Sequence, residues 1–223
     1  MTEPETFPVL RLDDRGPGPG ALIAGARSRR FSRDSPFYPG LRAPAPAGYA
    51  EALCEEAAPE VAAMMGWPRV TGLVPLASHY SLVTDPPSAL SPLQRVPHTD
   101  GPDGDVVALL HYLCGPGHGG TAFFRHRATG FARITADRRA AYDASLDRDV
   151  ASHGPPPPCY LGQEDEWWPR LYDRFASHDC RPGRLLAYPA NGLHCGRIPP
   201  GYEGSADPAR GRLTLNTFAR RAA

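Results

Sequence analysis

The pattern of hydrophobic and polar positions divides the chain into a helical first part and a β-rich second part. Residues 48–65 place apolar side chains at helical spacing among alanine and glutamate, which predicts a helix that Pro59 interrupts. A strand at 7–13 and a helix at 21–30 are expected before it. The proline-containing segment 37–46 is expected to be an ordered loop.

From His79 onward, short alternating runs are separated by proline and glycine, which is typical of β-strands. The expected strands are 79–84, 106–113, 121–125, 184–188, 193–198 and 212–218. The segments 137–149 and 164–178 are expected to be helical and form an insert at about 137–178. We predict one domain over 1–223 that is mainly β with flanking helices. Its core, at 76–220, is a double-stranded β-helix (a jelly roll of the cupin type), and residues 1–75 supply an amino-terminal strand and helices.

Composition narrows the classes of function. Lysine plus arginine (24) equals aspartate plus glutamate (24), so no net charge attracts nucleic acid or an anionic membrane. The chain contains no lysine, which excludes Schiff-base and P-loop mechanisms and favours a GC-rich bacterial gene as its source. The first residues lack the features of a signal peptide, so we expect a cytoplasmic protein. Its oligomeric state is left open.

Two histidines and an aspartate carry the most specific chemical signal. His98 and Asp100 are two positions apart, so on an extended segment both side chains point the same way. His194 lies on a later expected strand, which a jelly roll can bring alongside. Two imidazoles and one carboxylate form the facial triad of non-haem Fe(II) oxygenases and leave metal positions open. We therefore predict that His98, Asp100 and His194 bind the metal and form the catalytic centre.

The last expected strand carries a candidate anion site. Alternation places Arg212, Thr214 and Asn216 on one face of this strand. A guanidinium beside a hydroxyl is suited to hold a carboxylate inside a barrel, although a structural salt bridge is the alternative for Arg212. We predict that Arg212 and Thr214 bind a cosubstrate carboxylate.

These motifs resemble those of the Fe(II)/2-oxoglutarate-dependent dioxygenases, which share a double-stranded β-helix, a His-x-Asp…His triad and a later arginine. The order His98-Thr-Asp100, Tyr112-Leu, Gly-Gly-Thr-Ala-Phe-Phe (119–124) is most similar to the prolyl-hydroxylase-like branch. Several segments between about 7 and 219 also resemble an uncharacterised bacterial family of 2-oxoglutarate-oxygenase-like proteins. Arg212 follows His194 by 18 residues, a longer gap than is usual in the superfamily.

The resemblance implies Fe(II), 2-oxoglutarate as cosubstrate and O2, with Tyr112 as a further contact to the 2-oxoglutarate carboxylate. The expected reaction is hydroxylation or desaturation of a small molecule, amino acid or peptide, with succinate and CO2 as co-products. Asp100 fills the position that a halide would need, which disfavours halogenation. Two alternatives stay open. One is an iron oxygenase of this fold that does not use 2-oxoglutarate, and the other is a catalytically silent metal-binding scaffold.

Overall fold

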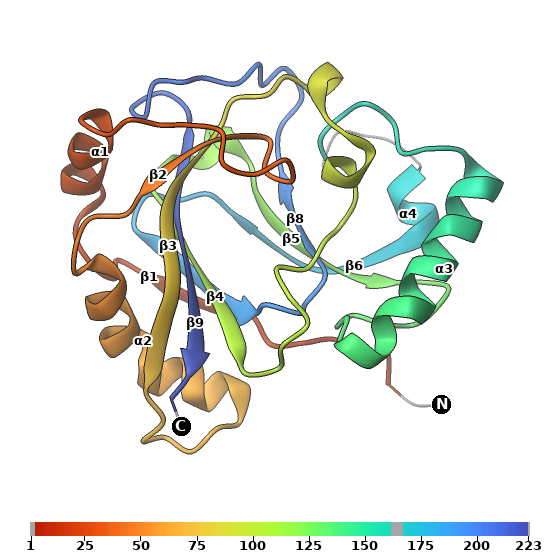
Figure 1. Cartoon of the computed structure of the whole chain (residues 1–223), viewed down its shortest axis with the longest axis horizontal. Helices are drawn as coiled ribbons and strands as arrows, with labels where there is room; N and C mark the ends of the chain where they lie inside the picture. Colours follow the sequence, from red (N-terminus) through yellow and green to blue (C-terminus); the bar gives the residue numbers. More distant parts are fainter. Residues whose placement is uncertain (1–2, 162–166, 223) are drawn as a thin grey trace.

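Two antiparallel sheets face each other in the structure, a computed structural model that describes residues 3–161 and 167–222 (Figure 1). Among these residues, the larger sheet has six strands in the order β1-β7-β4-β9-β3-β2, and the smaller has three in the order β6-β5-β8. The large sheet contains β1 (Leu10–Asp13), β2 (Gly40–Pro44), β3 (Leu73–Val83), β4 (Val106–Tyr112), β7 (Arg184–Pro189) and β9 (Arg212–Arg221). The small sheet contains β5 (Gly120–His126), β6 (Tyr172–Asp179) and β8 (His194–Arg197). The expected mainly β, jelly-roll fold is confirmed.

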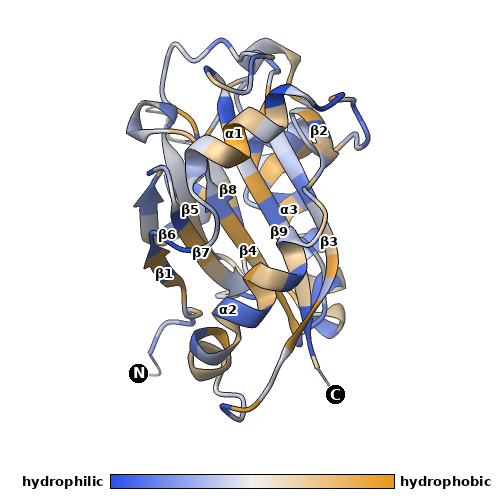
Figure 2. Ribbon diagram, turned by 90° about the vertical axis from the view of Figure 1, so that its left-hand side faces the viewer, coloured by the Kyte–Doolittle hydropathy of each residue, from blue (hydrophilic) through white to orange (hydrophobic). Residues whose placement is uncertain are grey.

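Helices cover the outer faces of both sheets. They are α1 (Pro19–Arg27), α2 (Tyr49–Met65), α3 (Ala136–His153) and α4 (Trp167–Leu171), with 3₁₀ turns at Pro87–Ala89, Pro92–Arg95 and Pro116–His118. Figure 2 views the molecule from the side of α1 and α2, which lie in front of the large sheet. Helices α3 and α4 lie beside the small sheet in Figure 1. In the described part of the chain, no helix combines the length and apolar character that crossing a bilayer requires.

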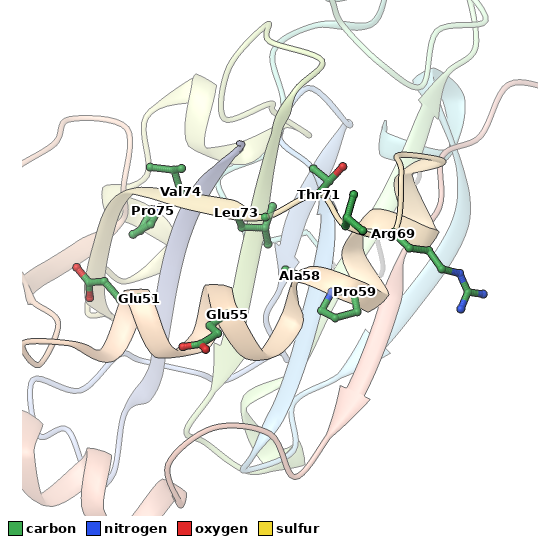
Figure 3. A pocket seen from close by; sticks show the side chains of 11 residues that line it. Glu51, Glu55, Ala58, Pro59, Arg69, Thr71, Leu73, Val74 and Pro75 are labelled. Atoms are coloured by element: carbon green, nitrogen blue, oxygen red, sulfur yellow. The ribbon is translucent and has the colours of Figure 1, made fainter. Parts of the chain in front are cut away.

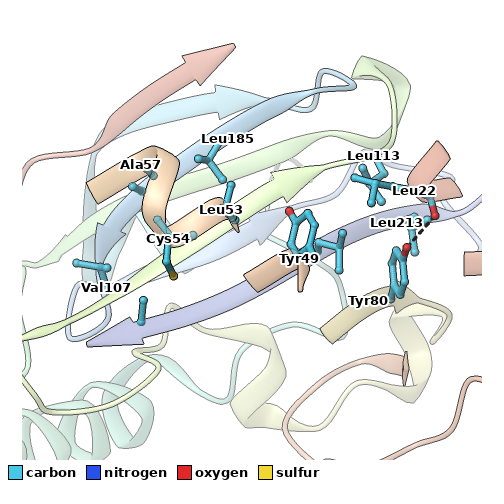
Figure 4. Close-up of a cluster of buried hydrophobic side chains, with 14 of the residues drawn as sticks. Leu22, Tyr49, Leu53, Cys54, Ala57, Tyr80, Val107, Leu113, Leu185 and Leu213 are labelled. Atoms are coloured by element: carbon cyan, nitrogen blue, oxygen red, sulfur yellow. Dashed lines mark hydrogen bonds between the residues drawn. The ribbon is translucent and has the colours of Figure 1, made fainter. Parts of the chain in front are cut away.

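Alternation along the strands explains how one sheet has two different faces. Leu213 and Leu215 of β9 are fully buried in the apolar cluster beneath α1 and α2, together with Leu53 of α2 and Leu109 of β4 (Figure 4). The intervening Thr214 points to the opposite face, toward the small sheet. The space between the two sheets is therefore lined by the side chains that alternate with those packed beneath α1 and α2.

Helix α2 runs without interruption through Pro59, contrary to the prediction from sequence. The proline and the preceding Glu55 lie on the exposed side of the helix, where water can satisfy the carbonyl that the proline leaves without a donor. Figure 3 shows both residues on this outer surface. Gly48 and Gly66 flank the helix with φ of 75° and 67°, left-handed conformations that favour glycine.

Two other expectations were wrong. The expected loop at 37–46 contains strand β2, which lies at the edge of the large sheet, where prolines interfere little with strand pairing. The expected helix at 164–178 is only α4 within the described residues; 164–166 lie outside them, and Tyr172–Asp179 is strand β6. Pairing along the whole of β5 favours this extended conformation over local helical preference. The insert at about 137–178 is thus part helix and part core strand.

Candidate metal centre and anion site

Backbone pairing brings the three predicted metal ligands together. His98 and His194 form an antiparallel bridge in which each backbone N–H donates to the other's carbonyl, both at 2.9 Å. The Asp100 N–H donates to the carbonyl of Ala190 at 2.8 Å. This bond holds the segment with His98 and Asp100 against the residues that precede β8. Side chains two apart then point to the same side, as predicted from the sequence.

The side chains of the triad converge on one point. One ligand atom from each of His98, Asp100 and His194 lies within 4.8 Å of the others, and His194 Nε2 is 3.4 Å from Asp100 Oδ2. His194 Nδ1 lies 3.0 Å from the carbonyl of Gly192 and, by donating to it, leaves the Nε2 lone pair free. This is the tautomer that a metal requires from a histidine ligand.

The electrostatics of the triad favour neutral imidazoles. His98 and Asp100 are exposed as whole residues, whereas His194 is buried; the side chain of Asp100 is only 18% exposed. Burial lowers the pKa of both histidines to about 4, and for His98 the nearby His194 adds to this effect while Asp100 opposes it. Burial also raises the pKa of Asp100, opposed by the charge of His98. A bound cation would offset this cost of an ionised carboxylate.

Aromatic side chains form the wall behind His194. The ring centroid of Tyr188, on β7, is 4.7 Å from that of His194, and Phe123, on β5, is 6.4 Å away. Both aromatic residues are buried in the cluster between the two sheets. Cys195 packs instead on the α3 side of the small sheet, as expected for the neighbour of an inward-pointing residue. The wall restricts water on one side of the triad.

Arg212 lies between the sheets with almost no solvent exposure. Its Nη2 donates to the carbonyl of Gly120 at 2.9 Å, which joins β9 to the first residue of β5. Its Nε is buried without a hydrogen-bond partner, and no carboxylate of the described residues forms a salt bridge with this guanidinium. The salt-bridge alternative considered for Arg212 therefore finds no partner among those residues. A buried cation without a counter-ion is costly, so an anionic ligand would stabilise it.

Tyr112 and Thr214 lie beside Arg212 but already have partners. They face each other across β4 and β9, and the Arg212 guanidinium is 5.9 Å from the centre of the Tyr112 ring. The hydroxyl of Tyr112 is hydrogen bonded to Thr121 Oγ1 at 2.6 Å, and Thr214 Oγ1 donates weakly to the carbonyl of Ser81 at 3.4 Å. Their hydroxyls are therefore engaged by the protein.

Two functional candidates near Arg212 were missed by sequence reasoning. Gly196 follows His194 by two residues on β8, and a Cβ there would lie 3.7 Å from Arg212 Nη2. Its missing side chain leaves room beside the guanidinium, a signal readable in the spacing His-x-Gly. Tyr38 has a buried hydroxyl without a partner, and burial raises its pKa while Arg212 opposes the shift. The sequence predicts a loop at this segment, and no pattern in it links Tyr38 to Arg212.

A third candidate, Arg42, was also missed. It is on β2, paired in register with Ser81 of β3, and its guanidinium stacks over the Tyr38 ring at 4.6 Å. Because the segment was expected to be a loop, alternation could not assign Arg42 a face. With β2 in the sheet, Arg42 continues the row formed by Ser81, Thr214 and Tyr112 on the inner face.

The surface grooves lie elsewhere. A groove of about 480 Å³ runs between α2 and the start of β3, lined by residues such as Glu51, Glu55 and Val74 (Figure 3). A second, of about 410 Å³, lies between α1 and the beginning of α2. Neither is lined by a triad residue or by Arg212, so the triad and the guanidinium are separate from both grooves.

Comparisons with known proteins give a family and distant structural neighbours. The sequence matches a family of unknown function, DUF6445, over residues 2–219. HygX from Streptomyces hygroscopicus, crystallised with nickel and 2-oxoglutarate, is 14% identical with a TM-score of 0.48, over 96% of this chain and 83% of HygX. AviO1 from Streptomyces viridochromogenes Tue57 is 17% identical with a TM-score of 0.47, over 97% and 91% of the two chains.

A third neighbour is SnoN, the non-heme alpha ketoglutarate dependent epimerase from nogalamycin biosynthesis. It is 14% identical with a TM-score of 0.49, over 96% of this chain and 78% of SnoN. Among curated proteins, none matches the sequence. The family description supplies no activity.

Proposed function

The chain belongs to the DUF6445 family, and we propose that it is a non-haem Fe(II)- and 2-oxoglutarate-dependent oxygenase. The proposed reaction hydroxylates or desaturates a small molecule, amino acid or peptide-type substrate while O2 converts 2-oxoglutarate to succinate and CO2. The observation that carries the proposal is a pair of features between the two sheets: a facial triad and a buried guanidinium without a carboxylate partner among the described residues.

The donor set of the triad fits Fe(II). His98 and His194 would each supply a neutral imidazole nitrogen, and Asp100 would supply a carboxylate oxygen. Bound iron and 2-oxoglutarate would supply the oxidising chemistry. Because Asp100 occupies a ligand position, we expect a product that carries no halogen even at high chloride concentration.

Arg212 suits the far carboxylate of 2-oxoglutarate. Gly196, two residues after the ligand His194, leaves the space beside the guanidinium without a side chain. Arg212 Nε and the Tyr38 hydroxyl are both buried donors that lack partners. Tyr112 and Thr214 would support the carboxylate from the neighbouring strand positions, although the protein already bonds their hydroxyls.

The proposal is tested with Arg212→Leu, because this change removes the anion site and leaves the triad intact. Metal content and 2-oxoglutarate affinity are measured separately under anaerobic conditions. We expect unchanged metal content and an affinity lower by about tenfold or more, the usual value of a lost charge-assisted hydrogen bond. The matched control is Arg220→Leu, which changes an exposed arginine on the same strand that pairs with Asp103.

Three outcomes would contradict the proposal. Equal loss of metal and 2-oxoglutarate binding would mean that Arg212 is structural. Oxygen consumption without succinate would indicate an iron oxygenase that does not use 2-oxoglutarate. Stoichiometric iron with no 2-oxoglutarate binding or decay would indicate a silent metal-binding scaffold.

A further inference from the structure

Arg42 is the second guanidinium on the inner face of the large sheet that the protein leaves largely uncompensated. Its nearest carboxylate is that of Asp34, 3.7 Å from Nη1, too long for a hydrogen bond, and the Asp34 side chain is 41% exposed. Its Nε is buried without a partner. Arg33 shows the contrast, because its two terminal nitrogens donate to Asp85 at 2.9 and 2.6 Å.

Arg42 lies on the inner face of the large sheet, in register with Ser81 of β3 and, across it, with Thr214 of β9, two residues from Arg212. The side chain is 25% exposed, whereas the whole of Arg212 is only 6% exposed. Arg42 is therefore the more accessible guanidinium on this face, and Arg212 is the one enclosed between the sheets.

Polar groups beside Arg42 can complete an anion site. Ser81 is its register partner on β3, and Asn216 of β9 donates from Nδ2 to Ser81 Oγ at 3.2 Å. Asn216 Oδ1 is buried without a donor. Rotating this amide by 180° would let Ser81 donate to Oδ1 and would turn the free end of Asn216 into an N–H donor. In the first orientation Ser81 keeps its O–H for an anion, and after rotation Asn216 keeps an N–H, so the pair offers one donor in either case.

We propose that Arg42, with Ser81 and Asn216, binds a carboxylate of the substrate, so that the molecule to be oxidised is a carboxylic acid such as a free or N-acylated amino acid. This rests on the proposed function, since it takes Arg212 as the cosubstrate site. A single carboxylate matches the one positive charge of Arg42, whereas a phosphate dianion would leave a net negative charge in the site. The planar guanidinium and amide also match a planar carboxylate.

The test uses Mn(II)-loaded protein saturated with 2-oxoglutarate, so that Arg212 is occupied. N-acetylglycine is the probe, and N-acetylglycinamide is its uncharged control. Paramagnetic relaxation of the acetyl methyl protons reports binding near the metal without turnover. We expect binding of the acid and not of the amide. Arg42→Gln should weaken binding of the acid by about tenfold, the value of one charge-assisted contact, and leave 2-oxoglutarate affinity unchanged.

Controls make the outcomes separable. Arg220→Gln should behave as wild type, and thermal unfolding establishes that Arg42→Gln is folded. Equal relaxation of acid and amide, or equal acid binding by wild type and Arg42→Gln, would overturn the substrate site. Loss of 2-oxoglutarate in Arg42→Gln but not in Arg212→Leu would make Arg42 the cosubstrate anchor and would also overturn it.

Failure of the proposed function would look different. If wild-type protein binds Mn(II) but not 2-oxoglutarate, the cosubstrate assignment fails. The relaxation comparison is then repeated without 2-oxoglutarate, with Arg212→Leu present in both proteins so that only Arg42 differs. A preference for the acid that depends on Arg42 would still support the carboxylate site, and its absence would end the inference.

Discussion

The two faces of the large sheet are built from the same strands but differ in whether their buried polar atoms have hydrogen-bond partners. On the outer face, Leu213 and Leu215 pack beneath α1 and α2, and the hydroxyl of Tyr80 donates to the carbonyl of Leu22 at 2.9 Å (Figure 4). On the inner face, Arg212 and Asn216 each have a buried polar atom without a partner.

We infer that the outer face contributes mainly to stability and the inner face mainly to ligand binding. Buried polar groups in proteins are usually hydrogen bonded, so a concentration of unpartnered ones on one face indicates groups reserved for a ligand. Among the described residues the outer face has one exception, Nε2 of His111, whose other nitrogen is 2.8 Å from the Tyr49 hydroxyl. We therefore expect substitutions on the outer face to change the free energy of unfolding and those on the inner face to change ligand affinity.

Asp100→Ala should give the largest effect. It removes one of three metal ligands, so metal affinity should fall by more than the roughly 10–100-fold that loss of an outer hydrogen-bond partner costs. Stability of the metal-free protein should not fall, because burial already makes ionised Asp100 costly. Bound metal after dialysis and the thermal midpoint are measured, with Asp103→Ala as an exposed control. Retained metal in Asp100→Ala would place the site elsewhere.

On the outer face, Leu213→Ala should destabilise the protein by about 2–5 kcal/mol, because Leu213 is fully buried and the change leaves a cavity. The adjacent inner residue supplies the control, since Thr214→Val removes only a long hydrogen bond and should cost about 1 kcal/mol or less. Urea denaturation measures both. A larger cost for Thr214→Val than for Leu213→Ala would invalidate the distinction between the faces.

His111 should make stability depend on pH. Burial lowers its pKa from 6.5 to about 4, with the charge of Glu56 opposing, so the folded state holds the neutral form. The stability that neutral His111 contributes is fully present above pH 6.5, the pKa in the unfolded chain, and is lost as the pH falls toward 4, the pKa in the folded protein. The difference between these two pKa values corresponds to about 3 kcal/mol. His111→Gln should flatten the curve of unfolding free energy against pH across this window. An unchanged slope would show that other groups cause the dependence.

Tyr80→Phe is the smallest of the expected effects. It removes the hydroxyl that bonds to the carbonyl of Leu22 and leaves the ring packing unchanged, so a loss of about 1 kcal/mol is expected. Urea denaturation can resolve this change, and metal affinity should be the same as in wild type. A change in metal affinity would mean that the outer face is coupled to the site.

The spacing of residues along strands made much of this architecture predictable. His98 and Asp100, two apart on extended backbone, converge with His194 as their pattern indicated. The segment containing Arg42 was harder, because prolines near an edge strand look like a loop until its partner β3 is known. Strand β6 likewise depends on pairing with β5, a long-range contact that local pattern does not encode.

Candidate residues outside recognisable motifs were missed for a related reason. Tyr38 and Gly196 matter through what surrounds them: an unpartnered hydroxyl, and a space that a side chain would fill. Neither property exists before the chain is folded. Tyr112 shows the converse, since the motif identified it but the fold bonds its hydroxyl to Thr121.

The central claim is that His98, Asp100 and His194 hold one iron between the two sheets. Anomalous diffraction at the iron absorption edge, from crystals grown anaerobically with Fe(II), tests it most directly. The account predicts one strong peak within roughly 2.5 Å of a donor atom from each of the three residues. A peak at any other position, or no peak at the triad with iron present in the crystal, would contradict it.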